Sequence, residues 1–443
     1  MKMNIFKKIA VGTGMFWYPH LPSKLRCFIK KNRQYKIVKY AVEHSEFYRE
    51  LYKDFPITRQ MDFTKLPVVT KPMIAENFDK IVTDPTITKK EVSEFLENPQ
   101  NANKLFHGKY TIAKTSGSSW TPVTIIHDSG YHAVFDCAFA IRGKVTYFPV
   151  CSIVSGRGFS IGLNSFMGNT DQKNYKLIDA NAKTSDIVES LNKMQPAEIQ
   201  SYPSAMLMLT YEQNRGTLHI HPKRIITSGE TLTDNIRSFI KDTFGCEVLS
   251  LYASTETGYI GCECPCGHLH IYDDWLDIEP VDENGNPVKD GELSEKIIIT
   301  NFSNKVQPIV RYEVTDMVRV VKNQRCPCGS RMPWVEVIGR SSDHFVFDCE
   351  GETRIVPRLH TLNYPDVVCW QNILYGQKRL EVRYLPREGV DHLGREKIEK
   401  FAFDEWTEAF RKYEIHGVEI YFSGKKPELD PFSGKLRMYI QKD

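Results

Sequence analysis

In this 443-residue sequence, the stretch KTSGSSWTPVTI, Lys114–Ile125, places hydroxyl side chains around one glycine. Hydroxyl and main-chain N–H donors in such a turn can hold phosphate oxygens. The same composition also occurs in plain turns between strands, where the hydroxyls satisfy exposed main-chain groups. Taken alone, this stretch favours the plain turn, so its neighbours along the chain have to decide its role.

Two cysteine-rich turns form the second chemical feature. GCECPCGHLHI and QRCPCGSRMP each contain the unit CPCG, about 60 residues apart. Four thiolates from two tight turns match a tetrahedral structural zinc site, whereas the alternative is four free thiols on surface loops. The predicted zinc ligands are Cys264, Cys266, Cys326 and Cys328. His270 or Cys262 can take the place of one cysteine, and the zinc would clip together a β region over about residues 260–335.

The middle of the chain predicts a strand, a helix and a second strand in succession. RIITSG, residues 224–229, is a short apolar strand that ends in a turn. The helix that follows begins with Thr233 or Asp234 as its cap and ends at Gly245, and CEVLSLY, residues 246–252, is the next strand. Such a βαβ unit predicts a mostly parallel sheet whose ligands lie at the carboxyl ends of the strands.

Polar motifs follow these strands in a recognisable order. SGE (228–230) and YASTE (252–256) are followed by RYEVTD (311–316), IGRSSD (338–343) and SGK (433–435). Together with the loop at 115–119, this series resembles the core motifs of the adenylate-forming enzymes. It is most similar to their branch of phenylacetate–CoA ligases, CapK-like capsule proteins and coenzyme F390 synthetases. Each motif is short, and their order from Phe47 to Lys435 is the specific part of the resemblance.

The resemblance implies an α/β fold. It would have a large N-terminal α/β region with parallel sheets and a β subdomain, at residues 1–340, and a small mobile C-terminal α+β domain, at residues 341–443. It also implies an enzyme that activates a carboxylic acid with ATP, releases pyrophosphate, and passes the acyl group from an acyl-adenylate to coenzyme A. An aryl acid is one candidate substrate.

The matching motifs assign a role to each residue. Lys435 would act over the α-phosphate, Thr255 would contact that phosphate, and Glu256 would bind Mg²⁺, which prefers carboxylate and phosphate oxygens. Asp316 would accept from the ribose hydroxyls, and Tyr252 would stack near the base. The other candidates for binding ATP or AMP are Thr115, Ser116, Gly117, Ser118, Ser119, Ser228, Gly229, Glu230, Ala253, Ser254, Arg311 and Arg340.

Two places depart from the family pattern. In the phosphate loop, Trp120 stands where glycine is frequent, and Thr121 where lysine is frequent. At the hinge, Ser342 takes the place of an acidic residue, and Asp343 follows it. Because Trp120 removes the freedom to adopt a positive φ, a catalytically weakened nucleotide-binding homologue is one alternative hypothesis. Another is acyl transfer to an amine, a sugar or a carrier protein instead of coenzyme A.

Composition limits the partners. The 58 basic and 55 acidic residues nearly cancel, so we expect no nucleic-acid partner. No apolar run reaches the length of a membrane span, although the lysine-containing amino-terminal stretch leaves a peripheral membrane contact open. The clustered cysteines favour reduced thiols and therefore a cytoplasmic protein. The partners that we expect are a small carboxylate and an acyl acceptor, and a homodimer stays open.

Overall fold

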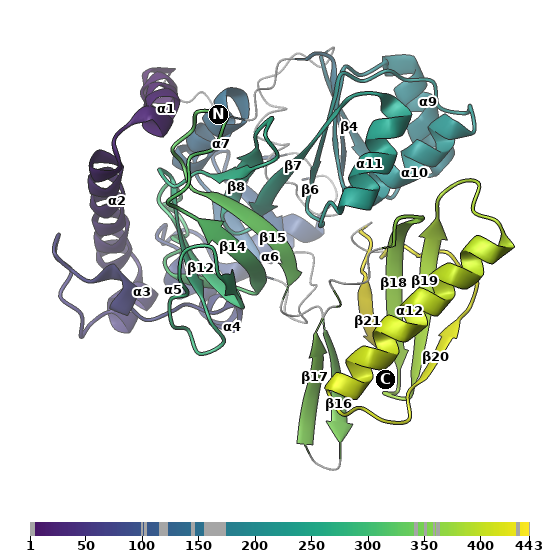
Figure 1. Ribbon diagram of the computed structural model, residues 1–443. Helices are drawn as coiled ribbons and strands as arrows, with labels where there is room; N and C mark the ends of the chain where they lie inside the picture. Colours follow the sequence, from purple (N-terminus) through teal and green to yellow (C-terminus); the bar gives the residue numbers. More distant parts are fainter. Residues whose placement is uncertain are drawn as a thin grey trace.

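The computed structural model describes residues 5–98, 101, 104–114, 123–142, 147–154, 174–340, 344–349, 352–357, 359, 364–430 and 435–442. It has a large mixed α/β part and a smaller α+β part built from the C-terminal hundred residues (Figure 1). The predicted fold class is therefore confirmed. Within the described residues, none of the helices combines the length and the apolar character that crossing a bilayer requires.

Helices dominate the first hundred residues. They are α1 (Ile5–Trp17), η1 (Tyr18–His20), α2 (Ser23–His44), α3 (Glu46–Leu51), η2 (Phe63–Lys65), α4 (Lys71–Glu76), α5 (Phe78–Ile81) and α6 (Lys89–Glu97). Ile37 and Ala41 of α2, which are four residues apart and therefore share one helix face, are buried. His44, the last residue of α2, is exposed and stacks on Tyr40.

A ten-stranded sheet forms the centre of the large part, with the order β11-β14-β15-β9-β8-β7-β6-β5-β3-β4 among the described residues. Its strands are β3 (Val150–Val154), β4 (Tyr175–Asp179), β5 (Glu198–Ser201), β6 (Arg224–Ser228), β7 (Glu247–Ser254), β8 (Gly258–Glu263), β9 (Leu269–Ile271), β11 (Leu293–Ser294), β14 (Asp316–Val321) and β15 (Trp334–Arg340). The pairs from β4 through β3, β5 and β6 to β7 are parallel, and the pairs beyond β7 are antiparallel.

The predicted βαβ unit is present. Helices α9 (Thr184–Met194), α10 (Pro203–Asn214) and α11 (Asp234–Phe244) pack on the parallel strands, and α11 joins β6 to β7 (Figure 1). Thr233 is the cap, since its side chain accepts from the main-chain N–H of Ile236. Gly245 ends the helix with a φ of 62°, a conformation that glycine adopts at little cost.

Among the described residues, the large part contains two smaller β units besides this sheet. The hairpin of β1 (Thr111–Lys114) and β2 (Thr124–His127) leads into α7 (Ser129–Ile141), and β10 (Leu276–Val281), β12 (Lys296–Asn301) and β13 (Tyr312–Val314) form a three-stranded sheet. One mixed apolar cluster joins β10 and β12 to β14 and β15. The region after β7 is therefore the β subdomain that the resemblance implies.

The C-terminal part is a four-stranded sheet crossed by one long helix. Its elements are the hairpin β16 (His344–Cys349) and β17 (Glu352–Pro357), the strands β18 (Val367–Tyr375), β19 (Arg379–Pro386), β20 (Glu419–Phe422) and β21 (Tyr439–Lys442), and α12 (His392–Lys412). Trp406 of α12 is fully buried against this sheet and Phe345. The predicted boundary near residue 341 lies outside the described residues and stays a prediction.

Candidate functional site

The candidate site lies where the parallel strands end. Ser228, the last residue of β6, is the register partner of Leu251 in β7. The residues that follow Ser228 and the residues from Tyr252 onward therefore lie at the same edge of the sheet, as the βαβ pattern predicts. The SGE and STE motifs are brought together by this register.

Gly229 meets the C-terminal part at this edge. Its φ is 79°, and a Cβ atom there would lie 3.1 Å from Nζ of Lys435 and 3.2 Å from ring carbons of Tyr202. The ammonium group of Lys435 lies over the Tyr202 ring, 5.1 Å from its centroid, within the range of a cation–π contact. Both the backbone angle and the close approach require glycine. Lys435, some two hundred residues away in sequence, thus reaches the strand ends.

Glu230 connects three parts of the chain. Its carboxylate accepts from the main-chain N–H of Ser204 at 2.9 Å, from the Ser204 hydroxyl at 2.7 Å, and from the main-chain N–H of Leu436 at 2.9 Å. Burial raises the pKa of Glu230, although the Ser204 bonds and the charge of Lys435 act in the opposite direction. Tyr202 and Ser204 thus contact the side chains of Lys435 and Glu230. Their contacts with Lys435 and Glu230 leave no mark in the local sequence.

A second set of contacts joins the C-terminal part to α11. The side-chain amide of Asn235 donates to the carbonyls of Tyr364 and Val367 at 2.9 and 2.8 Å. Arg387 donates to the hydroxyl of Ser238 at 2.6 Å. The two parts therefore meet through directed polar contacts on one helix face, which hold Lys435 in its position beside Gly229.

Tyr252 and Asp316 form a buried pair. The phenol of Tyr252 in β7 donates to Oδ2 of Asp316 in β14 at 2.5 Å, the short length of a hydrogen bond to a carboxylate. Asp316 is the backbone partner of Arg340 at the ends of β14 and β15, and the Arg340 side chain lies outside the described part. The structure thus brings together two residues that the motifs assigned to the nucleoside.

The turn between β7 and β8 carries the remaining STE residues. The Ser254 hydroxyl lies 2.8 Å from the Thr257 hydroxyl and accepts from the Thr257 main-chain N–H. Glu256 is half-buried and accepts from the phenol of Tyr312 at 3.1 Å. Thr255 is half-buried in the same turn. Hydrogen bonds between Ser254 and Thr257 thus hold the turn together. The contact of Tyr312 with Glu256 was not predicted from the sequence.

Arg311 does not have the surroundings expected of a phosphate ligand. Its guanidinium forms a two-pronged pair with Glu279 at 3.1 and 3.0 Å and donates to the carbonyl of Leu66. Only 5% of the residue is exposed. Because these partners use its donors within the protein, Arg311 is a structural residue of the large part, and we do not retain it as a candidate for phosphate binding.

The phosphate loop belongs to a part of the chain outside the described residues. Thr115, Ser116, Gly117, Ser118 and Ser119 lie outside the described residues, as do Trp120 and Thr121, and as do Ser342 and Asp343 of the hinge. The strands at the two ends of the loop are described, and Lys114 of β1 pairs with Thr124 of β2. The roles assigned to the loop remain predictions.

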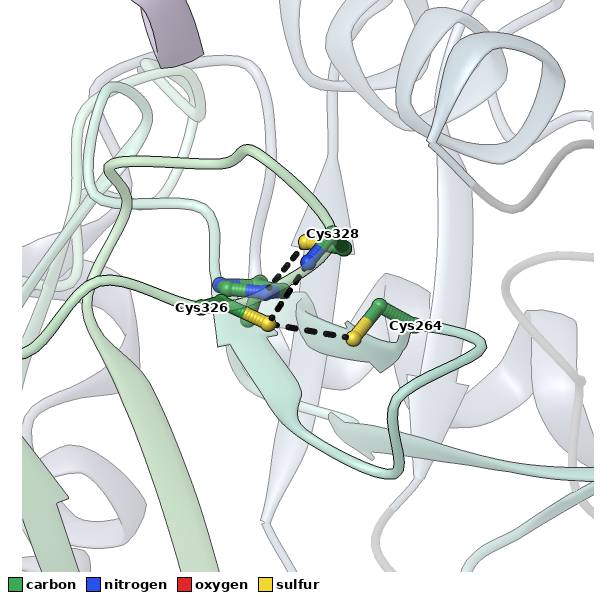
Figure 2. A group of neighbouring side chains, drawn as sticks. Cys264, Cys326 and Cys328 are labelled. Carbon is green, nitrogen blue, oxygen red and sulfur yellow. Dashed lines mark hydrogen bonds between the residues drawn. The ribbon is translucent and has the colours of Figure 1, made fainter.

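Cysteine and histidine side chains from the two CPCG regions meet in space. Possible ligand atoms of Cys264, His270, Cys326 and Cys328 all lie within 4.8 Å of one another. Sγ of Cys264 lies 3.6 Å from Sγ of Cys326 (Figure 2). Sγ of Cys328 lies 3.3 Å from Nε2 of His270. Three thiols and one imidazole are a donor set that zinc binds tetrahedrally.

The other ring nitrogen of His270 completes this arrangement. Nδ1 lies 3.2 Å from the carbonyl of Met332, which would fix the tautomer that leaves Nε2 free for a metal. Cys266 is exposed and is not in the four-residue group, whereas Cys262 is buried with its thiol 3.7 Å from the Glu263 carbonyl. The geometry therefore favours the predicted alternative with His270 over the four-cysteine set.

Phe135 of α7 stacks on Tyr259 of β8 with ring centroids 4.0 Å apart. Both rings line a cavity of about 20 Å³, and Thr257 of the turn between β7 and β8 also lines it. A space of this size holds about one water molecule, so its walls would have to move apart to take an acyl group.

Comparison with known proteins supports the resemblance. No family profile matches the chain. The chain is 25% identical over 340 residues to protein CapK of Staphylococcus aureus, a match that covers 71% of this chain and 68% of CapK. It is 28% identical over 172 residues to the phenylacetate-coenzyme A ligase of Pseudomonas putida, a match that covers 37% of this chain and 38% of that protein.

A solved structure shares the fold over nearly the whole chain. The 2-hydroxyisobutyryl-CoA ligase in its postadenylation state superposes with a TM-score of 0.72 at 18% identity, covering 96% of this chain and 91% of the ligase. The same ligase in its thioesterification state gives 0.61. The fold is thus that of the adenylate-forming ligases. CapK and phenylacetate-CoA ligase are sequence relatives of the chain, and both findings support its resemblance to the adenylate-forming CoA ligases.

Proposed function

We propose that this protein activates a carboxylic acid with ATP to an acyl-adenylate and then transfers the acyl group to coenzyme A. The observation that carries the proposal is the position of Lys435 beside Gly229 and Tyr202, with Leu436 bonded to Glu230. Negative charge builds up on the α-phosphate during adenylation, so this step needs a cation at the strand ends. Lys435 of the C-terminal part would provide that cation.

The nucleoside would be held at the edge of the sheet. Asp316 would accept from the ribose hydroxyls, and the short bond from Tyr252 would hold its carboxylate in one orientation. Ser228, Gly229, Ala253 and Ser254 would present main-chain groups to the adenine and the phosphates, and Glu230 shapes this turn from behind through Ser204. Thr115–Ser119 would orient the outer phosphates, and Arg340 would add charge near them.

In the first step, a carboxylate oxygen of the acid attacks the α-phosphorus, and the bond to pyrophosphate breaks. Lys435 would stabilise the charge on the α-phosphate oxygens, with the Thr255 hydroxyl as a further donor. Glu256 would hold Mg²⁺; a half-buried carboxylate beside phosphate oxygens suits this hard cation, and the ion would neutralise charge on the phosphates. In the second step, the thiolate of coenzyme A attacks the acyl carbon, and AMP leaves.

The zinc site would be structural. Cys264 and His270 flank the β8–β9 turn, and Cys326 and Cys328 lie in the connection between β14 and β15. The β7–β8 hairpin bears the STE turn, and β15 leads toward residue 341. A zinc ion there would hold this hairpin and this strand together. All eleven cysteines are free of disulfides, which supports a reducing, cytoplasmic compartment.

The C-terminal part, beginning near residue 341, would rotate between the two steps. In the described arrangement Lys435 is at the strand ends, the position suited to adenylation, and the TM-score is higher with the postadenylation state than with the thioesterification state of the 2-hydroxyisobutyryl-CoA ligase. Rotation would withdraw Lys435 and break the contacts of Asn235 and Glu230 with the C-terminal part.

Exchange of labelled pyrophosphate into ATP, measured with a panel of aliphatic and aryl acids, tests the first step. Exchange that depends on one acid supports the proposal, and absence of exchange with every acid supports a catalytically weakened homologue. Coenzyme A, amines, sugars and carrier protein offered to the preformed adenylate then identify the acceptor. If an amine or a sugar releases AMP but coenzyme A does not, thioester formation is contradicted. The proposed adenylation step would still stand.

A further inference from the structure

An exposed apolar surface lies at the N-terminal edge of the molecule. Five of the nine large apolar side chains that are exposed among the described residues belong to α1 and the start of α2. They are Ile9, Phe16, Trp17, Leu25 and Phe28. Trp17 is 59% exposed and Phe28 65%, and the rings of Phe16 and Trp17 meet edge to face at 5.3 Å. Scattered single apolar residues are ordinary on a surface, but a concentration of this kind is not.

These side chains are presented by an anchored helix. On the opposite side of α1, Met15 is 1% exposed and packs with Val11 against Val134 and Ala138 of α7. Lys8 of α1 also pairs with Asp136 of α7 at 2.7 Å. The helix is therefore held against the large part by its inner face, and its apolar outer face is left in water.

The charge of this region is one-sided. The first 42 residues contain ten Lys or Arg residues and no Asp or Glu, in a chain that is nearly balanced overall. Three of these cations face inward from α2: Arg26 pairs with Asp273 at 3.4 Å, Lys30 pairs with Asp277, and Arg33 donates to the carbonyl of Asp274. They fasten α2 to the β subdomain.

Other cations of α2 face outward. Lys24, Lys31 and Lys36 are exposed, and none of the ion pairs among the described residues includes them. Lys24, Phe28 and Lys31 follow one another at the i, i+4 and i+7 spacing that places side chains on one helix face. Lysines therefore flank the exposed apolar side chains on the same side of α2.

We infer that the outer faces of α1 and α2 form a docking surface for an anionic lipid membrane. Aromatic and aliphatic side chains that enter the acyl boundary, flanked by lysines that meet lipid phosphates, are the features of helices that lie in a membrane interface. A nucleic acid would use the lysines but leave the apolar side chains in water. A second copy of the chain would bring these lysines against one another.

The arrangement of the molecule suits this partner. Figure 1 shows α1 and α2 along one edge of the large part, while α12 and its sheet lie at the opposite side. A chain that lies on a membrane by this edge would keep the C-terminal part in water, where it can rotate. The lipid surface would then bring the enzyme close to membrane-bound acids or acceptors without covering the strand ends.

Co-sedimentation of the full chain with vesicles tests the inference. We expect binding to vesicles of phosphatidylcholine mixed with phosphatidylglycerol, and little binding to phosphatidylcholine alone. The triple variant Lys24→Gln/Lys31→Gln/Lys36→Gln should partition roughly 100-fold more weakly, because each lysine near an anionic surface contributes about a fivefold factor. The variant Trp17→Ser/Phe28→Ser should lose about tenfold or more.

A matched control separates this surface from general stickiness. Leu393 and Phe403 of α12 are also exposed, at 58% and 45%, so Leu393→Ser/Phe403→Ser should bind vesicles like the parent. Equal loss in this control, equal binding to both kinds of vesicle, or no binding by the parent would overturn the inference. So would a concentration-dependent dimer that Trp17→Ser/Phe28→Ser abolishes, or binding of RNA that competes with the vesicles. These outcomes are independent of pyrophosphate exchange.

Discussion

The main-chain N–H of Leu436 donates to Oε1 of Glu230 at 2.9 Å, and this bond ties the residue next to Lys435 to the end of strand β6. The same carboxylate accepts two bonds from Ser204 at the start of α10. Glu230 therefore positions the Lys435 turn against the large part without having to contact a reacting atom.

Replacing Glu230 by Gln should slow adenylation by roughly 10- to 100-fold, since a hydrogen bond to a charged group contributes about 1.5–3 kcal/mol. An amide cannot accept at both positions. Thioester formation from supplied acyl-adenylate should be unaffected, because that step does not need this arrangement. The exposed Glu247, changed to Gln, is the control. Equal loss of both half-reactions would mean that Glu230 acts only on folding.

The raised pKa of Glu230 also predicts a pH dependence. Burial favours the protonated form, so the carboxylate would lose its charge at a higher pH than an ordinary glutamate as the solution is acidified. A protonated Glu230 cannot accept all three bonds, and adenylation should decline on the acid side. Rates of the first half-reaction across pH, measured for the parent and for Glu230→Gln, should show this decline in the parent only.

Lys435→Ala should reduce adenylation by roughly 100-fold or more, the loss typical of a removed donor at a developing oxyanion. Transfer from supplied acyl-adenylate should continue. Lys442 also lies over a tyrosine ring, 5.2 Å from the centroid of Tyr375, and Lys442→Ala is therefore the matched control. Single-turnover rates of adenylation and of acyl transfer test this prediction. An equal fall in both rates would contradict a role of Lys435 that is confined to adenylation.

Tyr252→Phe should raise the KM for ATP by roughly tenfold, because the Asp316 carboxylate loses the bond that orients it. Asp316→Asn should have a similar or larger effect, and the double variant should be less than additive. Tyr384→Phe removes a comparable phenol–carboxylate bond to Glu399, 2.8 Å long, in the C-terminal part and should leave the KM unchanged. Additive effects of the two substitutions on the KM for ATP would mean that Tyr252 does not act through Asp316.

Purified protein should contain one zinc ion per chain, which atomic absorption can measure. Cys328→Ser and His270→Ala should lower the zinc content and the Tm, because a structural zinc ion stabilises the fold that holds its ligands. Cys266→Ser should retain the zinc. If zinc stays near zero in the parent, the site holds no metal, and if Cys266→Ser alone loses it, the four-cysteine set is the correct one.

The sequence by itself determined the elements whose signals are local. Thr233 and Gly245 predicted the two ends of α11, because capping signals act within a few residues. The two CPCG turns predicted a metal site, since two ligands in one turn already lie close together. The order of the SGE, STE and RYEVTD motifs predicted the superfamily.

Only the tertiary structure decided which distant residues meet. It favoured His270 over Cys266, paired Arg311 with Glu279, and bonded Glu230 to Leu436, 206 residues further along the chain. These choices depend on how strands and helices pack, and a residue's chemical type is the same whether its charge faces a nucleotide or a buried partner. The sequence therefore showed that Arg311 stands in a family motif and is charged. Only the fold showed that its partner is Glu279.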